Sequence, residues 1–366
     1  MMNEKSRQSI IRGCLAGGAI GDALGYPVEF MSWPAIQRAH GEAGIQAFAP
    51  DKRTGLALIS DDTQMTLYTA VGLLNHDTAL RLRGRADPPA AFIWKAYRDW
   101  YFCQRDGRAP DGNTAWISGC AAMCARRAPG NTCLQALRMG EPGLIDEPVN
   151  NSCGCGGIMR VAPAALYFSD PADVLEGDRL AADAAALTHG HSLGWISSAA
   201  FAHIVGRAAW GGCRYGDGLM GIVRESMEAI EALFPDNGFV QEQQELVDKA
   251  VWLAGRGGDD ARALHSIGGG WTGHDALADA VYCCLRYPDD FSRAVTAAVN
   301  HDGDSDSTGA IVGNIMGAWL GIGAIEPRWL EALEARDEIF ALADDLAAGC
   351  PDAPDAAWRE RYDLRR

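Results

Sequence analysis

Two runs of glycine at every fourth position constrain the fold of this chain more than any other feature. A spacing of four places the glycines of each run along one face of a helix. Because glycine costs a helix about 1 kcal/mol per residue, such a face indicates close approach by another backbone. We predict two central helices, each the candidate partner of the other. Their glycines are Gly13, Gly17, Gly21 and Gly25 in one, and Gly309, Gly313, Gly317 and Gly321 in the other.

The rest of the chain is dominated by helical patterns. Apolar residues recur at helical spacing over residues 63–74, 195–209 and 219–234, and alternating β-type runs are almost absent. Glycine and proline fall between the helical segments, and no low-complexity linker divides the chain. We therefore predict an all-α fold, with residues 1–366 forming a single compact domain of many short, obliquely packed helices. Further helices are expected at residues 90–101, 241–253, 275–286, 291–300 and 329–348.

Charge and cysteine content exclude several classes of protein. A net charge of −16 argues against a general nucleic-acid or anionic-membrane binder, because nothing basic would neutralise phosphates. The first residues lack the pattern of a signal peptide, and the eleven cysteines complete no zinc-binding pattern. We expect reduced thiols and a cytoplasmic location.

Residues 300–309, NHDGDSDSTG, place carboxylates and hydroxyls directly before the second glycine run. Asp302, Asp304 and Asp306 have no Lys or Arg nearby in the sequence, so they would repel one another without a cation or a set of donors. Hard divalent cations prefer such oxygen ligands. The alternative is an N-cap for the following helix, but a cap needs only one or two of these residues. We favour a metal site, with the cap as the alternative.

A second acidic cluster, Ser60–Asp61–Asp62–Thr63, also stands at the start of a predicted helix. The alternative is again a cap, with Asp61 or Asp62 as the N-cap residue. If the two clusters face each other, they offer four carboxylates and several hydroxyls to one or two cations. Such a set suits Mg²⁺ or Mn²⁺. Zinc is disfavoured because no set of His or Cys accompanies the carboxylates.

A glycine-rich stretch over residues 150–163, NNSCGCGGIMRVAP, could bind a phosphate through bare backbone N–H groups. Arg160 could assist there or be tied to a structural partner. In THGHSLG, His189 or His191 could contact a ligand or act as a capping or packing residue. Neither a G-x-S-x-G elbow, a Walker A motif nor a dinucleotide-binding fingerprint occurs.

Taken together, these stretches resemble the ADP-ribosylglycohydrolase family. The resemblance is carried, in chain order, by GCLAGGAIGDALGYPVEF, SDDTQMT, RAPGNTCLQALRMG, NSCGCGGIMRVAPAAL, LTHGHSLG, GGGWTGHDALADAVYCCLR and NHDGDSDSTGAIVGNIMGAWLG. These motifs span a core of about residues 10–325. The resemblance implies an all-α fold around a central binuclear metal site that holds two Mg²⁺, with Mn²⁺ as the alternative.

The resemblance also implies a role for individual residues. Glu29 matches a family glutamate near the metals, and Cys155 stands where some members have Asn. Asp61, Asp62 and Glu29 are the candidates for general acid or base, and the sequence does not choose among them. The implied metal ligands are Ser60, Asp61, Asp62, Asp304, Asp306 and Ser307. The implied substrate-binding residues are Asn150, Asn151, Ser152, Cys153, Gly154, Cys155, Gly156, Gly157, His189 and Trp271.

The implied activity is hydrolysis of the glycosidic bond between ADP-ribose and an acceptor. Arginine on a modified protein is the first candidate acceptor, so that the reaction would reverse mono-ADP-ribosylation. The alternatives are an immunity protein that neutralises an ADP-ribosylating toxin, a hydrolase of small ADP-ribose conjugates, and a catalytically silent, crystallin-like relative. The expected partner is the ADP-ribose moiety of a modified protein or conjugate.

Overall fold

The computed structural model describes residues 6–216 and 218–364, and in these residues it is entirely helical. Eighteen α-helices and five short 3-10 helices follow one another, and the described residues contain only two isolated β-bridges and no strand. The predicted all-α fold is confirmed. None of the helices in the described part of the chain has the length and apolar character to cross a membrane. All eleven cysteines are free.

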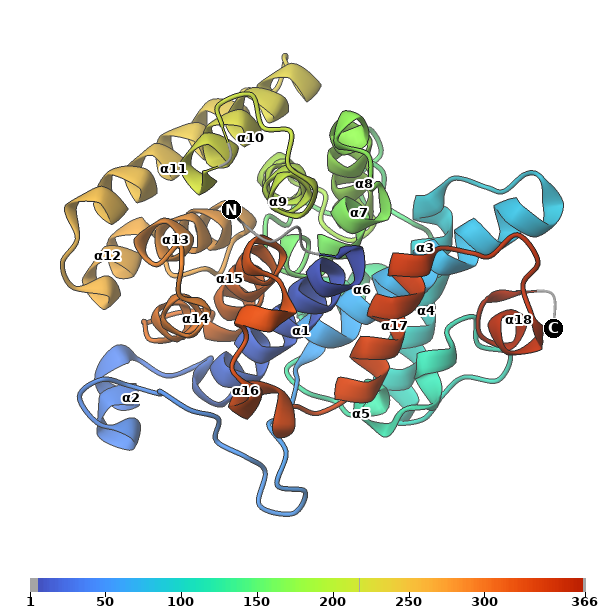
Figure 1. Ribbon diagram of the computed structural model, residues 1–366, viewed down its shortest axis with the longest axis horizontal. Helices are drawn as coiled ribbons and strands as arrows, with labels where there is room; N and C mark the ends of the chain where they lie inside the picture. Colours follow the sequence, from blue (N-terminus) through green and yellow to red (C-terminus); the bar gives the residue numbers. More distant parts are fainter. Residues whose placement is uncertain (1–5, 217, 365–366) are drawn as a thin grey trace.

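The two glycine-striped segments form helices α1 (Arg7–Gly25) and α15 (Ser305–Leu320), which pack against each other at the centre of the molecule (Figure 1). Their backbones almost touch. A Cβ atom added to Gly21 would lie 1.9 Å from the carbonyl oxygen of Gly309. Any side chain larger than hydrogen would therefore separate the helices, and the predicted pairing is confirmed. The facing pairs are Gly13 with Gly317, Gly17 with Gly313, Gly21 with Gly309, and Gly25 with Ser305.

This pairing is antiparallel, so α1 ends where α15 begins. The chain leaves α1 through a short 3-10 turn, Tyr26–Val28, and reaches Glu29 beside the first turn of α15. The glycine stripes thus bring a glutamate near the start of the chain to the acidic loop near its end.

Helix α3 (Asp61–Arg83) supplies the third part of the same region. Ser60 is its N-cap, and Asp22 on α1 accepts hydrogen bonds from the backbone N–H groups of Ser60, at 3.0 Å, and Thr63, at 3.1 Å. Asp22 is fully buried. A carboxylate on the central helix therefore fixes the start of α3 next to the start of α15.

The remaining helices flank this centre on two sides (Figure 1). Helices α9 to α14 lie on one side, and α3, α4, α17 and α18 lie on the other. The bounds are α2 Trp33–His40, α4 Pro89–Asp106, α5 Ala121–Cys124, α6 Asn131–Met139, α7 Ala162–Tyr167, α8 Val174–Ala186, α9 Ser192–Trp210, α10 Leu219–Leu233, α11 Phe239–Arg256, α12 Asp260–Ile267, α13 Gly273–Arg286, α14 Phe291–Val299, α16 Pro327–Glu331, α17 Arg336–Ala348 and α18 Ala356–Tyr362.

One predicted helix is divided in the structure. Residues 329–348 belong to α16 and α17, and the backbone between them is drawn into an isolated parallel bridge between Ala57 and Leu333. Ala335 then adopts a left-handed conformation, with φ of 54°, directly before α17. The single helix predicted here is wrong because a long-range backbone pairing competes with local helical propensity.

Candidate active site

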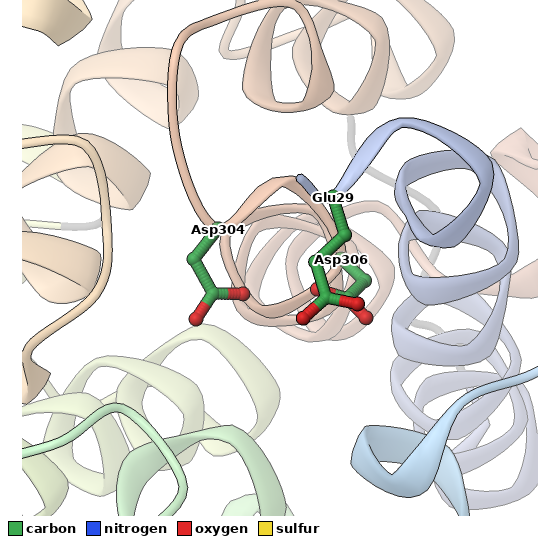
Figure 2. Close-up of side chains that lie close together, drawn as sticks. All are labelled: Glu29, Asp304 and Asp306. Atoms are coloured by element: carbon green, nitrogen blue, oxygen red, sulfur yellow. The ribbon is translucent and has the colours of Figure 1, made fainter. Parts of the chain in front are cut away.

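Glu29, Asp304 and Asp306 form a compact carboxylate cluster where α1 ends and α15 begins. One oxygen from each of the three lies within 4.8 Å of the others. Figure 2 shows the side chain of Glu29 next to that of Asp306, with Asp304 on the other side of the first turn of α15. All three residues are buried. This is a set of oxygen ligands of the type that hard divalent cations prefer.

The first acidic cluster lies beside the second one, which meets the condition for a shared site. Asp61 and Asp62 line the same cavity as the three carboxylates, and its volume is about 390 Å³. No Lys or Arg among the described residues lines it. The other lining residues are Phe30, Ala128, Pro129, Gly130, Asn131, Thr132, Cys133, Gly154, Cys155, Gly156, Met159, His189, Trp271 and Ser307.

Residues of both acidic clusters cap the helices that follow them. The Ser60 hydroxyl accepts from the N–H of Asp62 at 3.2 Å, and Asp304 caps α15 by accepting from the N–H of Ser307 at 3.3 Å. Asp61 accepts from the N–H of Gly130 at 3.1 Å. The cap predicted at Asp61 or Asp62 is wrong, because Ser60 occupies that position. The helix ends therefore use only part of the oxygen atoms gathered here.

Two buried carboxylate oxygens in the cavity have no hydrogen-bond partner. They are Oδ2 of Asp62 and Oε2 of Glu29, on side chains that are 3% and 8% exposed. A buried polar atom without a partner costs free energy of about 1–3 kcal/mol, more for a charged group. A bound cation would satisfy both atoms, so the residues present fit a metal site.

The electrostatics of the cluster lead to the same conclusion. Burial, followed by repulsion from Asp304 and Asp61, raises the pKa of Glu29 to about 8. Burial is also the largest cause that raises the pKa of Asp61 to about 8, and it raises the pKa of Asp62 and Asp306 well above the usual range. A cation would favour the ionised forms of all these groups.

The glycine-rich turn forms the opposite wall of the cavity. Gly154, Cys155 and Gly156 line it, and the turn is held by a hydrogen bond from the N–H of Cys155 to the carbonyl of Trp271 at 3.2 Å. Trp271 itself lies at the mouth and stacks on Phe30, with ring centroids 5.7 Å apart. The turn and the tryptophan are therefore one unit.

His189 is a buried, neutral member of this wall. Its Nδ1 lies 2.8 Å from the hydroxyl of Thr188. Burial, aided by the charge of Arg160, lowers the pKa of His189 to about 3. His191, the other candidate, instead caps α9 by accepting from the N–H of Leu193.

Six of the predicted site residues do not line the cavity: Ser60, Asn150, Asn151, Ser152, Cys153 and Gly157. Asn150 has a clear different role. Its side chain donates to the carbonyl of Thr188 at 2.7 Å and accepts from the N–H groups of Ser152 and Gly190. It therefore shapes the turn from behind.

Of the two roles considered for Arg160, help in phosphate binding or attachment to a structural partner, the structure shows the structural one. It is fully buried, donates to the Thr188 hydroxyl at 2.6 Å and to the carbonyl of Ala184, and lies over the ring of Tyr97. Arg160 therefore supports the residues around His189 and does not reach the cavity.

The cavity wall at the start of α6 was not predicted from the sequence. Residues 128–133 line the cavity, and α6 begins at Asn131 with no side-chain cap, so its first N–H groups remain available. Ala128 has a φ of 47°, which is uncommon for a residue other than glycine. The Ala-Pro-Gly-Asn sequence marks a turn before a helix, but nothing local places that turn beside the acidic clusters. Asp22 was also missed, although a carboxylate on a glycine-rich helix was a signal.

Comparison with known proteins places this arrangement in a family. Residues 3–355 match the family model for ADP-ribosylglycohydrolase. The chain is 25% identical to mouse ADP-ribosylhydrolase ARH3, over 92% of this chain and 91% of that protein. It is 26% identical to the ADP-ribosyl-[dinitrogen reductase] glycohydrolase of Rhodospirillum rubrum, over 89% and 90% of the two chains.

A solved structure agrees with this placement. It is described as an ADP-ribosylglycohydrolase-related protein complex and matches with a TM-score of 0.61 and 25% identity, covering 94% of this chain and 98% of that chain. The chain therefore belongs to the ADP-ribosylglycohydrolase family, whose members hydrolyse glycosidic bonds to ADP-ribose.

Proposed function

We propose that this protein is a metal-dependent hydrolase that releases ADP-ribose from a modified protein, with arginine as the preferred acceptor. The observation that carries the proposal is the group of five buried carboxylates in one cavity, which is lined by no Lys or Arg from residues 6–216 and 218–364. One relative is named for an action on a modified protein, dinitrogen reductase. That name supports a protein substrate.

Asp61, Asp62, Asp304 and Asp306 would hold two Mg²⁺, with Mn²⁺ as the alternative, and the hydroxyls of Ser60 and Ser307 would assist. When bound, these cations supply positive charge that polarises substrate oxygens and a water molecule. Asp62 is the best-placed ligand because its Oδ2 has no other partner. Ser60 would need to release its cap to contribute its hydroxyl.

Glu29 is our candidate for the residue that moves a proton. Its Oε2 is buried, unpartnered and close to Asp306. A carboxyl group in this position can accept a proton from water or donate one to the leaving group. Asp61 is less suited, because its Oδ2 is already engaged by Gly130.

The ADP-ribose would lie along the walls of the cavity. The uncapped start of α6 and the N–H groups of Gly154 and Gly156 can hold the diphosphate. Trp271 and Phe30, at the mouth, offer aromatic faces to the adenine. The neutral His189 can exchange a hydrogen bond with a ribose hydroxyl without adding charge.

The test is to incubate the purified protein with arginine- and serine-ADP-ribosylated proteins, in Mg²⁺ or in EDTA, and to measure released ADP-ribose. We expect release from the arginine conjugate in Mg²⁺ alone. No release from either conjugate in Mg²⁺ would refute the proposed hydrolase activity. Release by the double variant Asp304→Ala plus Asp306→Ala would refute the assignment of these residues as metal ligands. Asp302→Asn is the matched control, since Asp302 lies in the same loop but outside the cavity.

A further inference from the structure

Two sulfur atoms face the first turn of α15, among the proposed oxygen ligands. The thiol of Cys155 donates to Oδ2 of Asp304 at 2.8 Å, and the thioether of Met159 lies 3.9 Å from the hydroxyl of Ser307. Both sulfur-bearing residues line the cavity. Sulfur is a poor ligand for Mg²⁺ but a preferred ligand for softer cations.

We infer that this cavity also binds a thiophilic divalent cation, Zn²⁺ or Cd²⁺, through Cys155 and Asp304, in competition with Mg²⁺. The inference rests on the metal site of the proposed function. It concerns a different ligand, the thiol, and a different class of cation. Occupancy by such a cation would place a strongly held ion where the hydrolase needs an exchangeable, oxygen-bound one.

The geometry suits a shared cation. Zinc binds thiolate sulfur at about 2.3 Å and carboxylate oxygen at about 2.0–2.2 Å. Two ligands of one tetrahedral zinc are then about 3.5 Å apart, so Sγ of Cys155 and Oδ2 of Asp304, at 2.8 Å, need only a small side-chain rotation. No backbone movement is required.

A further ligand is available beside them. Oε2 of Glu29 has no hydrogen-bond partner, although the side chain is only 8% exposed. Glu29 also has an oxygen within 4.8 Å of one from Asp304 and one from Asp306. The site thus combines one sulfur with several carboxylates, and a thiophilic ion would gain a partner that Mg²⁺ does not use.

Binding forms a metal–sulfur bond and breaks the S–H bond of Cys155, and the proton leaves to solvent. No atom changes oxidation state, so no oxidant or reductant is needed. The thiol exchanges its hydrogen bond to Asp304 for a cation that both groups bind.

The test uses the full chain, freed of metal with EDTA and then dialysed, with Cd²⁺ as the probe. Thiolate–Cd²⁺ bonds give an ultraviolet charge-transfer band, which reports sulfur ligation without any assay of activity. Wild-type protein should gain this band with one equivalent of Cd²⁺, and excess Mg²⁺ should raise the Cd²⁺ concentration needed. Cys155→Ser should lose the band and bind Cd²⁺ at least about 10-fold more weakly.

Cys153→Ser is the matched control, because Cys153 lies two residues away and does not line the cavity. It should keep the wild-type band. Circular dichroism of each variant checks that the helices are retained. An equal band in Cys155→Ser, no band in the wild type at one equivalent, or a Cd²⁺ affinity indifferent to Mg²⁺ would overturn the inference.

The outcomes separate this inference from the proposed function. If wild-type protein shows the Cys155-dependent band but releases no ADP-ribose in Mg²⁺, the thiophilic site is supported and the hydrolase function is refuted. If wild-type protein releases ADP-ribose in Mg²⁺ but shows no such band, the proposed function is supported and only the thiophilic site is refuted.

Discussion

Glu225 on α10 and Asp306 on α15 are equally buried, each 2% exposed, yet they have opposite surroundings. Glu225 lies 3.0 Å from the guanidinium of Arg207 and 3.4 Å from that of Arg214. Burial raises the pKa of Glu225, but a hydrogen bond from Cys213 and the charge of Arg207 outweigh it, so the net shift is downward. For Asp306, burial and the carboxylates of Asp62 and Asp304 all raise the pKa.

Burial alone therefore does not distinguish a carboxylate of the candidate site from a structural one. The α8–α10 group, made of Asp178, His203, Arg207 and Glu225, brings its own cationic side chain, Arg207. Among the described residues, no Lys or Arg lines the cavity, which is why we propose that an external cation binds there. Asp62→Asn is the variant with the largest expected effect. It should lower kcat/KM by about 1000-fold, because losing a proposed metal ligand removes several kcal/mol of transition-state stabilisation. Hydrolysis of ADP-ribosylarginine in saturating Mg²⁺ is the measurement.

Asp178→Asn is the matched change in the other group, because Asp178 is equally inaccessible and bonds His203 at 2.7 Å. Its folded fraction should hydrolyse the substrate at the wild-type rate. If Asp178→Asn and Asp62→Asn lowered activity equally, the two groups would not differ in function.

Glu225→Gln should have the opposite profile, with a large effect on stability and little on catalysis. Removing one charge from a buried pair leaves Arg207 uncompensated, which costs about 3 kcal/mol in the free energy of unfolding. Urea denaturation measures it. An unchanged urea midpoint would mean that Glu225 is solvated in solution.

Gly21→Ala should disturb the cavity through the central helices. The new Cβ would lie 1.9 Å from the Gly309 carbonyl, and such overpacking costs about 2–3 kcal/mol. Mg²⁺ affinity should fall too, because Glu29 follows directly after α1 and Asp22 on α1 fixes the start of α3. Gly255→Ala on α11 is the control, since nothing lies within 4 Å of its added Cβ. Stability loss in Gly255→Ala of the same size would contradict the close approach.

The two groups should also differ in how stability depends on pH. The folded pKa values of Glu29 and Asp61, about 8, exceed the unfolded values near 4. The metal-free native state therefore holds more protons than the unfolded state, and stability falls as pH rises from about 4.5 to 8. Glu225, with its lowered pKa, contributes stability that is lost only as pH falls through that value.

Urea midpoints of the metal-free protein between pH 5 and 8 check this slope. Glu29→Gln should make it shallower, and Mg²⁺ should remove most of it by binding the ionised carboxylates. A slope that Mg²⁺ leaves unchanged would separate the titrating groups from the metal site.

The smallest expected effect is a gain. Above the raised pKa of Asp306, Asp306→Asn should stabilise the metal-free protein by about 1 kcal/mol, because a neutral side chain then replaces one of several mutually repelling carboxylates. The same variant should lose the rise in Tm that Mg²⁺ gives the wild type. A decrease in metal-free stability would indicate that Asp306 has a cationic neighbour in solution.

The sequence was informative where the spacing of residues within one segment indicates contact with a distant segment. The glycine stripes predicted that α1 and α15 touch, because close backbone approach offsets the helix cost of the seven stripe glycines that lie within the two helices. Hydroxyls and carboxylates stand before two helices, and the family resemblance implied that residues 60–62 and 304–307 form one metal site. In the structure Asp61, Asp62, Asp304, Asp306 and Ser307 line one cavity, and Ser60 does not.

Side-chain direction was the part that spacing could not predict. Ser60 turns its hydroxyl to its own helix, and Asn150 turns behind the glycine-rich turn. The cavity wall before α6 comes from a segment whose chemistry is backbone N–H, which any sequence carries. Asp22 acts through contacts with residues about 40 positions away, and such contacts leave no periodic pattern.

The antiparallel pairing of α1 with α15 also sets the order in which the protein can mature. Gly25 and Ser305 meet although they are 280 positions apart in the sequence, and closing a loop of that length costs about 5 kcal/mol of chain entropy. During synthesis the glycine face of α1 must wait until nearly the whole chain has been made. The carboxylates meet only at that stage. A divalent ion can therefore stabilise the finished fold, but it cannot bind to early folding intermediates and guide their formation.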